Sequence, residues 1–271
     1  MKRPAGAYTI IEVMIVLAIS GTLLLSAIGL FRGQRGETAF DQAVHDASSE
    51  ISTRVKEVGS TSLPNGADFG CTLDGSQHAV LSSGGSPPGQ GSNDQCVVLG
   101  KAFEAAAGSS DIYIYTVLGR RVLPSGDVVQ KLSDSNPEPV VAGVGNGVDI
   151  TEKYSLPNGA KVATSYVKLT SDNSLQKRSL VGYYTNLQGD AAGGQNGSQL
   201  LTIKGYNYNN ATSHNLNMIQ RCLEQSACAA PDDISLWELC LSDPDGRKTA
   251  VLDVLSSSSG LSTSLKFTPC S

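Results

Sequence analysis

The chain has 271 residues, with a formal net charge of -5 and 17% charged side chains. This length suits one large domain or two small ones, and the acidic balance argues against a broad basic surface for nucleic acid. The 29 glycines and the frequent Ser- and Asn-rich runs favour a loop-rich β domain over a helical bundle.

An apolar run from Tyr8 to Phe31 follows a short basic stretch, residues 1–7, that holds no acidic residue. As a helix, at about 1.5 Å per residue, the run would be roughly 36 Å long and would cross a bilayer core of about 30 Å. Lys2 and Arg3 in front of the run predict a cytoplasmic N-terminus. The sequence therefore predicts a single membrane-spanning helix over residues 8–31.

Glu12 is the residue that a simple signal peptide or membrane anchor leaves unexplained. A secretory signal peptide would place small residues after the apolar run, whereas Gly6 and Ala7 precede it. A carboxylate within a membrane helix costs on the order of 3 kcal/mol at the bilayer centre, so it needs a partner. If the chain is cut after Ala7, the new α-amino group of Tyr8 can pair with Glu12 of a neighbouring subunit and fix the axial register of the two helices.

The run from Ala7 to Ile19, Ala-Tyr-Thr-Ile-Ile-Glu-Val-Met-Ile-Val-Leu-Ala-Ile, resembles the processing and assembly motif of type IV prepilins and type II secretion pseudopilins. The resemblance implies that residues 1–7 are a leader, that a prepilin peptidase cuts before Tyr8 and methylates the new N-terminus, and that Glu12 is the family's fifth mature residue. Three departures are Ala7 where Gly is usual, Tyr8 where Phe is usual, and the absence of a mid-helix Pro. Cleavage after Gly6 stays an alternative.

A second helical segment is expected beyond the apolar run. Gly33 and Gly36 weaken the helix and are expected to allow a bend. Apolar residues then recur at spacings of three and four, at Phe40, Val44, Ala47, Ile51, Val55 and Val58. Residues 32–59 are therefore predicted to form an amphipathic continuation of the helix that packs on the head.

Residues 60–271 are predicted to form an extracytoplasmic head rich in strands and loops, so that the whole chain is α+β. Stretches of β-rich composition between Gly-, Ser-, Asn- and Pro-rich turns mark the candidate strands. They are 77–81, 95–100, 111–117, 140–144, 161–169, 178–184, 199–203, 234–241, 249–255 and 264–268.

The six cysteines all lie in the predicted head, at Cys71, Cys96, Cys222, Cys228, Cys240 and Cys270. An even number outside the membrane helix favours disulfides in an oxidising compartment, with buried free thiols as the alternative. Six cysteines allow about fifteen pairings, and the sequence does not choose firmly among them. The favoured set is Cys71 with Cys96, Cys222 with Cys228, and Cys240 with Cys270. A bridge near the C-terminus would resemble the loop-closing disulfide of many pilins.

Catalytic and metal chemistry find little support in the sequence. The three histidines, His45, His78 and His214, are widely separated, and the chain has neither a nucleophile elbow nor a phosphate-binding loop, so we expect no enzyme and no cofactor. Asp243 and Asp245 alternate in a turn and are candidate calcium ligands, although the longer EF-hand spacing and its terminal Glu are missing.

Together these features predict a structural filament subunit, held in the cytoplasmic membrane before assembly and located in a cell-surface filament afterwards. The resemblance implies other pilin subunits, the prepilin peptidase, the assembly platform and the membrane as partners. The head exceeds the usual domain size of about 100–150 residues, which favours a minor pilin over the major one. The alternatives are a pseudopilin of a type II secretion or DNA-uptake system, and a pilin whose head binds a surface ligand or DNA.

Overall fold

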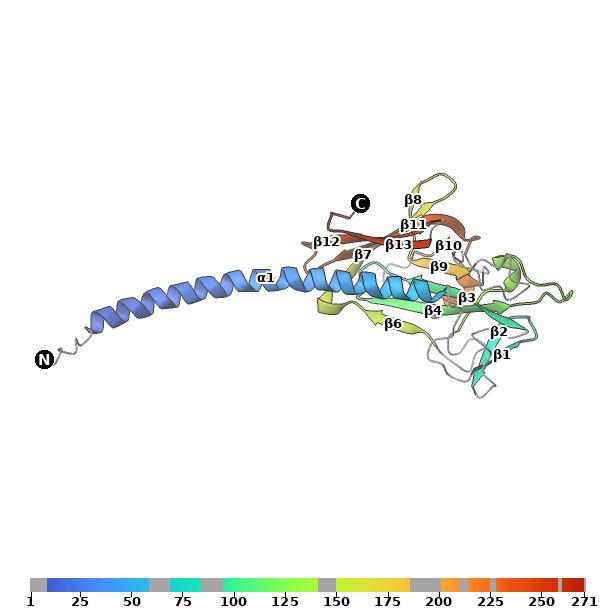
Figure 1. Cartoon of the computed structure of the whole chain (residues 1–271), viewed down its shortest axis with the longest axis horizontal. Helices are drawn as coiled ribbons and strands as arrows, with labels where there is room; N and C mark the ends of the chain where they lie inside the picture. Colours follow the sequence, from blue (N-terminus) through green and yellow to red (C-terminus); the bar gives the residue numbers. More distant parts are fainter. Residues whose placement is uncertain are drawn as a thin grey trace. The chain divides into compact units, whose positions relative to one another are not determined.

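The computed structural model describes residues 9–58, 69–83, 95–140, 150–185, 201–209, 214–224, 228–257 and 260–270. The fold is α+β, with helical structure near the N-terminus followed by antiparallel sheets (Figure 1). The chain divides into two compact units, Met1–Gln42 and Ala43–Ser271. The first unit is helical where it is described, and the second contains the sheets.

Helix α1 spans Ile10–Val58 as one element. Its backbone stays helical through Gly33 and Gly36, so the two helical segments expected from the sequence are continuous. The six apolar positions predicted to form a stripe are all buried, with Phe40 at 3% exposure and the others at 2% or less. The period of three and four residues therefore identified correctly the face of the helix that packs on other residues.

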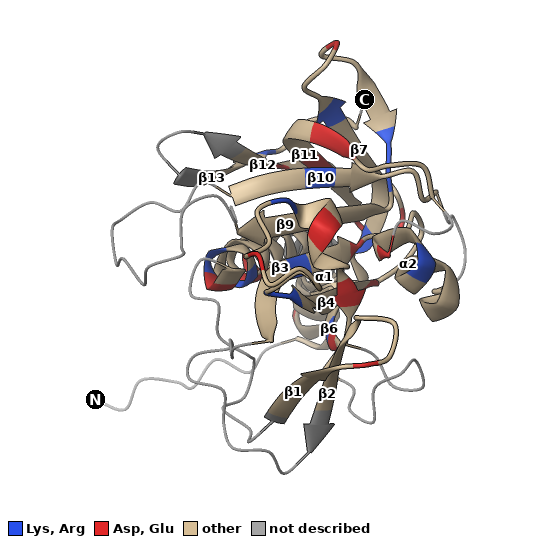
Figure 2. Ribbon diagram, turned by 90° about the vertical axis from the view of Figure 1, so that its right-hand side faces the viewer, with Lys and Arg blue, Asp and Glu red and all other residues tan. Residues whose placement is uncertain are grey.

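The strands of the second unit form two sheets in which every described pairing is antiparallel. A separate hairpin consists of β1 (Phe69–Leu73) and β2 (Ala79–Ser83), which Figure 2 shows apart from the other strands. We call the two parts of the large sheet the first and second half-sheets. The first comprises β3 (Cys96–Glu104), β4 (Asp111–Arg120), β5 (Glu138–Pro139), β6 (Glu152–Ser155), β9 (Leu180–Thr185) and β10 (Leu201–Tyr206). The second comprises β7 (Lys161–Leu169), β8 (Leu175–Lys177), β11 (Asp232–Ser242), β12 (Thr249–Ser257) and β13 (Gly260–Lys266).

The half-sheets are joined by a short ladder between β10 and β11, in which Lys204 pairs with Asp233 and Gly205 with Asp232. Aromatic side chains support this junction from the core. Phe103 of β3 lies 5.6 Å, between ring centroids, from Trp237 of β11. Trp237 is fully buried, and its indole N–H donates to Ser165 Oγ of β7 at 2.9 Å. This hydrogen bond satisfies the polar atom of the largest buried side chain.

The predicted strands agree with the structure to different degrees. The prediction over 161–169 matches β7 to the residue, and seven others overlap β2, β3, β4, β9, β10, β11 and β12 with shifted ends. The last strand, β13, begins at Gly260 rather than Ser264, and β5 ends at Pro139, just before the strand expected at 140–144. Residues 141–144 of that prediction lie outside the described residues. The sequence analysis missed β1, β6 and β8.

The short helix α2 (Leu216–Leu223) was also missed. Its N-cap is Asn215, whose side-chain oxygen accepts from the backbone N–H of Met218 at 3.1 Å. Ile219 and Leu223 are buried against the first half-sheet, together with Cys222. A helix of eight residues is marginal by itself, so its stability depends on this packing and its sequence signal is weak.

Candidate functional site

The most unusual surface of the described chain is the N-terminal part of α1. Its large apolar side chains are exposed, from 48% at Val13 to 83% at Ile10. The set consists of Ile10, Ile11, Val13, Met14, Ile15, Val16, Leu17, Ile19, Leu23, Leu24 and Leu25. These side chains point in all directions around the helix, unlike those of a surface helix with one apolar face. Such a helix requires either an apolar medium or partner helices.

Among the residues that the structure describes, no helix is both long and apolar enough to count as a membrane-crossing segment. The predicted membrane helix over 8–31 extends beyond the described side chains of this region, which cover residues 9–26.

Glu12 has a local role that the sequence analysis did not foresee. Its carboxylate Oε2 accepts from the backbone N–H of Thr9 at 2.9 Å and from the Thr9 hydroxyl at 3.0 Å. In return, the Thr9 hydroxyl accepts from the backbone N–H of Glu12 at 3.3 Å. This reciprocal pair is a capping box, and its signal was the Thr-x-x-Glu spacing at the start of an apolar run.

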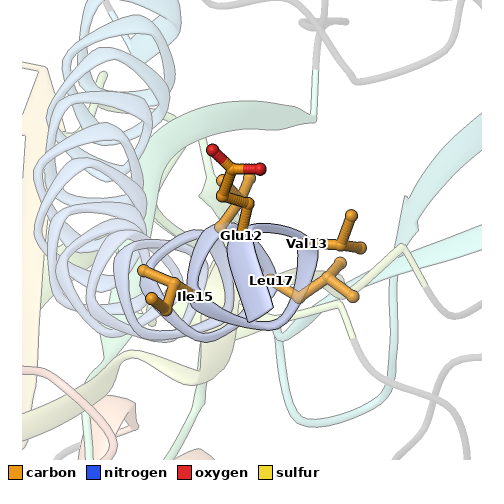
Figure 3. Close-up of a pocket in the computed structure, with 5 residues that line it drawn as sticks. Glu12, Val13, Ile15 and Leu17 are labelled. Carbon is orange, nitrogen blue, oxygen red and sulfur yellow. The ribbon is translucent and has the colours of Figure 1, made fainter. Parts of the chain in front are cut away.

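The Glu12 carboxylate projects from one side of the helix, with Val13 and Leu17 on one flank and Ile15 on the other (Figure 3). Together with Val16, these residues line a hollow in the helix surface. All five come from the same stretch of one helix, so the hollow is an open surface and not an enclosed cavity. Glu12 is the only charged residue between Thr9 and Ser26.

Two hydroxyl groups farther along α1 are bonded within the helix. Thr22 Oγ1 donates to the carbonyl oxygen of Ile19, and Ser26 Oγ donates to the carbonyl oxygen of Thr22, each at 2.9 Å. These bonds satisfy the donors without water, and similar bonds make Ser and Thr tolerable in apolar helices. The predicted processing residues, Ala7 and Tyr8, lie outside the described residues.

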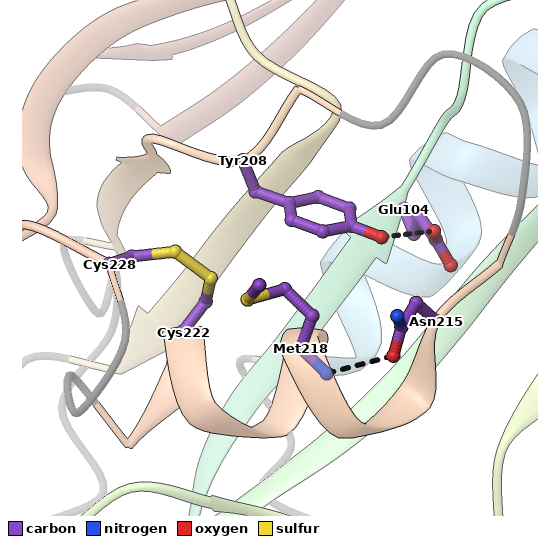
Figure 4. The surroundings of a disulfide bond; sticks show 6 residues. All are labelled: Glu104, Tyr208, Asn215, Met218, Cys222 and Cys228. Carbon is purple, nitrogen blue, oxygen red and sulfur yellow. Dashed lines mark hydrogen bonds between the residues drawn. A yellow bond between two sulfur atoms is a disulfide. The ribbon is translucent and has the colours of Figure 1, made fainter.

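The structure joins the six cysteines as Cys71–Cys96, Cys222–Cys228 and Cys240–Cys270. These are the pairs that the sequence analysis favoured. Cys71–Cys96 connects β1 to the start of β3, and Cys240–Cys270 connects β11 to the segment after β13. Figure 4 shows Cys222–Cys228 at the end of α2, near Tyr208.

A network of ion pairs connects the C-terminal end of α1 to the first half-sheet. Lys101 of β3 is 3% exposed, and its Nζ lies 2.7 Å from Glu57 Oε2 of α1 and 2.8 Å from Glu152 Oε1 of β6. Arg54 of α1 adds pairs to Glu152, Glu57 and Glu50. The sequence analysis did not identify these ion pairs.

The three histidines lie apart from one another, each with its own partner. His45 lies against the ring of Phe267, with 6.1 Å between centroids. His78 Nδ1 lies 3.0 Å from Glu138 Oε2. His214 Nδ1 lies 2.6 Å from Oε2 of the buried Glu104, and its ring stacks on Tyr113 at 3.9 Å.

Glu104 is the centre of a polar cluster that the sequence could not reveal. Besides His214, it accepts hydrogen bonds from Tyr115 at 2.8 Å and from Tyr208 at 3.4 Å, the latter drawn in Figure 4. These residues lie up to 110 positions apart, and strand pairing brings them together. The contacts satisfy a carboxylate that is 1% exposed, which accounts for its burial.

The two candidate calcium ligands lie in the turn between β11 and β12. Asp243 Oδ1 accepts from the backbone N–H groups of Arg247 at 2.7 Å and Lys248 at 3.1 Å. The carboxylate therefore stabilises the turn itself, as the turn interpretation of this sequence requires. Asp245 is exposed, and no group of metal-ligating side chains occurs among the described residues.

The chain matches no family model, and neither curated proteins nor solved structures yield a match.

Proposed function

We propose that this chain is a structural subunit of a type IV pilus or a related filament, and that it is a minor pilin because its head is larger than a typical domain. Before assembly the N-terminal helix lies in the cytoplasmic membrane. After cleavage before Tyr8, the helix enters the filament core, and the head faces outward. The observation that carries the proposal is an apolar helix surface, exposed on all sides, with the single carboxylate of Glu12 close to its start.

The size of the exposed apolar surface supports a role in assembly or membrane insertion. Burying a Val, Leu, Ile or Met side chain contributes about 1.5–3 kcal/mol. The N-terminal part of α1 exposes eleven such side chains, so burying all of them would contribute tens of kcal/mol of stabilisation. A surface of this size is not stable in water, whereas lipid before assembly and neighbouring helices after assembly would both cover it.

The disulfides support an extracytoplasmic head. All six cysteines are paired, and such bonds persist in oxidising compartments. The predicted cytoplasmic N-terminus and an extracytoplasmic head together require one crossing of the membrane, and residues 8–31 are the only apolar run long enough for it.

The first test is the mass of the N-terminal peptide of the protein isolated from sheared filaments. We expect a peptide that begins at methylated Tyr8, and a peptide that begins at Thr9 or Ala7 would place the cut elsewhere. Quantification in the same preparation should find this chain far below the major subunit in amount. An intact Met1 would contradict the processing mechanism, and an abundance equal to the major subunit would contradict the minor-pilin assignment.

A pseudopilin of a type II secretion or DNA-uptake system is the alternative that the same observation supports, because those subunits assemble through the same kind of helix. Deletion of the gene distinguishes a pilus subunit from a pseudopilin. Loss of surface filaments with normal secretion supports the pilus, whereas loss of secretion or DNA uptake with normal filaments supports the alternative.

A further inference from the structure

Strand β13 (Gly260–Lys266) is the outermost strand of the second half-sheet. It pairs with β12 over its full length, from Lys266 opposite Val251 to Gly260 opposite Ser257. Among the residues that the structure describes, no strand pairs with its other side. The outward N–H and C=O groups of such an edge strand can bond a further strand, so β13 is a template for strand addition.

Other strands at the margins of the large sheet carry the protections that native proteins place on sheet edges. β5 has two residues and ends in Pro139, and β8 has three residues and ends in Lys177. β6 has four residues, of which Glu152 and Lys153 are charged. In contrast, β13 has seven residues, contains no proline, and is charged only at its last residue, Lys266. Of these four strands, β13 is therefore the one whose edge is open to another strand.

The sequence of β13 reads the same in both directions about Thr263, as Leu-Ser-Thr-Ser-Leu over residues 261–265. In an antiparallel ladder between two copies that is centred on Thr263, each Leu lies opposite a Leu, each Ser opposite a Ser, and Thr263 opposite its own copy. Apolar residues then face apolar residues and hydroxyl groups face hydroxyl groups, and such cross-strand pairs stabilise a sheet. The strand is thus complementary to itself, as an interface with two-fold symmetry requires.

The charges of β13 do not oppose this pairing. Lys266 would lie opposite Gly260 of the other copy, so the two lysines would be at opposite ends of the ladder. Positions 260 and 266 are six residues apart, which is about 20 Å along a strand. This separation exceeds the Debye length of about 8 Å at physiological ionic strength, so the repulsion between the lysines is screened. Within its own chain, Lys266 Nζ also lies 2.7 Å from Asp253 Oδ2 of β12.

We propose that β13 is a self-association surface, at which the heads of two copies of this chain pair through an antiparallel β13–β13 ladder centred on Thr263. The ladder joins the second half-sheets of the two copies into one continuous sheet. A two-fold contact of this kind closes on itself, so it forms pairs and does not propagate into longer assemblies.

The direction of β13 decides which heads can pair. Phe267, which follows β13 directly, lies 6.1 Å between ring centroids from His45 of α1. His45 is close to the start of the second unit at Ala43, so β13 runs toward the end of the head at which α1 enters. Antiparallel pairing reverses one head end for end, so the two α1 helices enter from opposite ends. If the proposed function holds, the paired heads therefore belong to separate filaments or opposed membranes.

The test is analytical ultracentrifugation of the full-length protein in an excess of detergent micelles, over a series of protein concentrations. We expect a monomer–dimer equilibrium for the wild type. Thr263→Lys places two like charges opposite each other on the two-fold axis, so the Kd of the dimer should rise about fivefold or more. Thr263→Glu should have the same effect. An equimolar mixture of the two variants sets Lys against Glu and should restore the dimer, which also shows that both variants fold.

The matched control is Leu175→Lys, which adds a lysine to the exposed side of another edge strand, β8, and should leave the equilibrium unchanged. Dimers that persist equally in Thr263→Lys and Thr263→Glu would show association through another surface, the apolar part of α1 included, and would overturn the proposal. A mixture of the two variants that stays monomeric would also overturn it, as would a wild type that stays monomeric at every concentration. Entry into filaments is measured separately, so a failure of the proposed function leaves this test unaffected.

Discussion

At the scale of single residues, Glu12 has two candidate partners that make different demands on it. Within the chain, its carboxylate completes a capping box with Thr9 and stabilises the start of α1. In the proposed filament, it would pair with the α-amino group of Tyr8 of another subunit. The first role needs hydrogen bonds and the second needs a negative charge, so substitutions can separate them.

Two substitutions at this helix end have opposite effects on charge and capping. Glu12→Gln keeps a side chain that can complete the capping box but removes the charge. Thr9→Val keeps the charge but removes the capping hydroxyl, at a cost of about 1 kcal/mol to the helix end. If charge pairing drives assembly, Glu12→Gln should reduce incorporation into sheared filaments at least tenfold, and Thr9→Val should reduce it far less. Incorporation is measured by immunoblotting against the membrane pool, and the opposite order would make capping the dominant role.

The sequence contained the signal for this cap, but it could not contain the signals for close approaches between strands. Gly100 of β3 is an example, because a Cβ there would collide with the carbonyl oxygen of Tyr183 on β9. The strand composition around Gly100 identified β3 correctly. The need for Gly appears only once β3 and β9 are paired, through residues that lie far apart in the chain.

At the scale of elements, the elements with the strongest periodicity were predicted best. The stripe of α1 and the β7 strand follow from residue spacing and β-rich composition alone. The missed strands β1, β6 and β8 are five, four and three residues long, and the missed helix α2 has eight residues. Segments this short acquire their conformation from their neighbours, so their own sequence carries little information. The ion-pair network between α1 and β3 was missed because its members lie far apart in the chain and meet only in the folded protein.

The buried Lys101 fixes how α1 lies on the first half-sheet, because it bonds Glu57 of the helix and Glu152 of β6 together. Lys101→Met should lower the free energy of unfolding by about 1–3 kcal/mol, since two acidic groups lose their shared cation while keeping partial contact with water. The matched control is Lys153→Met, which removes a pair with Asp111 from a lysine that is half exposed. That variant should change stability much less than Lys101→Met in the same denaturant titration. Equal losses of stability in the two variants would show that the burial of Lys101 does not determine how much its ion pairs stabilise the fold.

At the scale of the whole molecule, three disulfides close loops of different lengths in a head with many loops. Cys71–Cys96 and Cys240–Cys270 separate their partners by 25 and 30 residues, and Cys222–Cys228 by only 6. A longer closed loop restricts the unfolded chain more strongly. The sequence favoured these pairs without choosing firmly among the possible pairings, and only the folded sheet brings β11 and the C-terminal segment together.

Replacing both cysteines of a pair by Ser should therefore cost stability in the order of loop length. Loop-closure entropy predicts losses of about 3.5 kcal/mol for Cys71–Cys96 and about 2 kcal/mol for Cys222–Cys228. Denaturant titration of the full-length protein in detergent, under non-reducing conditions, measures both. A larger loss for the shorter loop would show that packing around α2, and not chain entropy, decides the effect.

The short ladder between β10 and β11 would have a mechanical consequence if the head carried tension in the proposed filament. No disulfide joins the two half-sheets: Cys71–Cys96 joins the β1–β2 hairpin to the first, Cys222–Cys228 lies at the end of α2, and Cys240–Cys270 lies within the second. The long ladder of β11 and β12 pairs seven residues on each strand, whereas β10 and β11 share two pairs. A tensile force that separates the half-sheets would therefore load the two-pair ladder, the aromatic contacts behind it and the backbone hydrogen bonds between Val162 of β7 and the turn at Gly108 and Ser109. Under tension, the half-sheets would separate at this junction, while the disulfide-bonded parts on either side keep their structure.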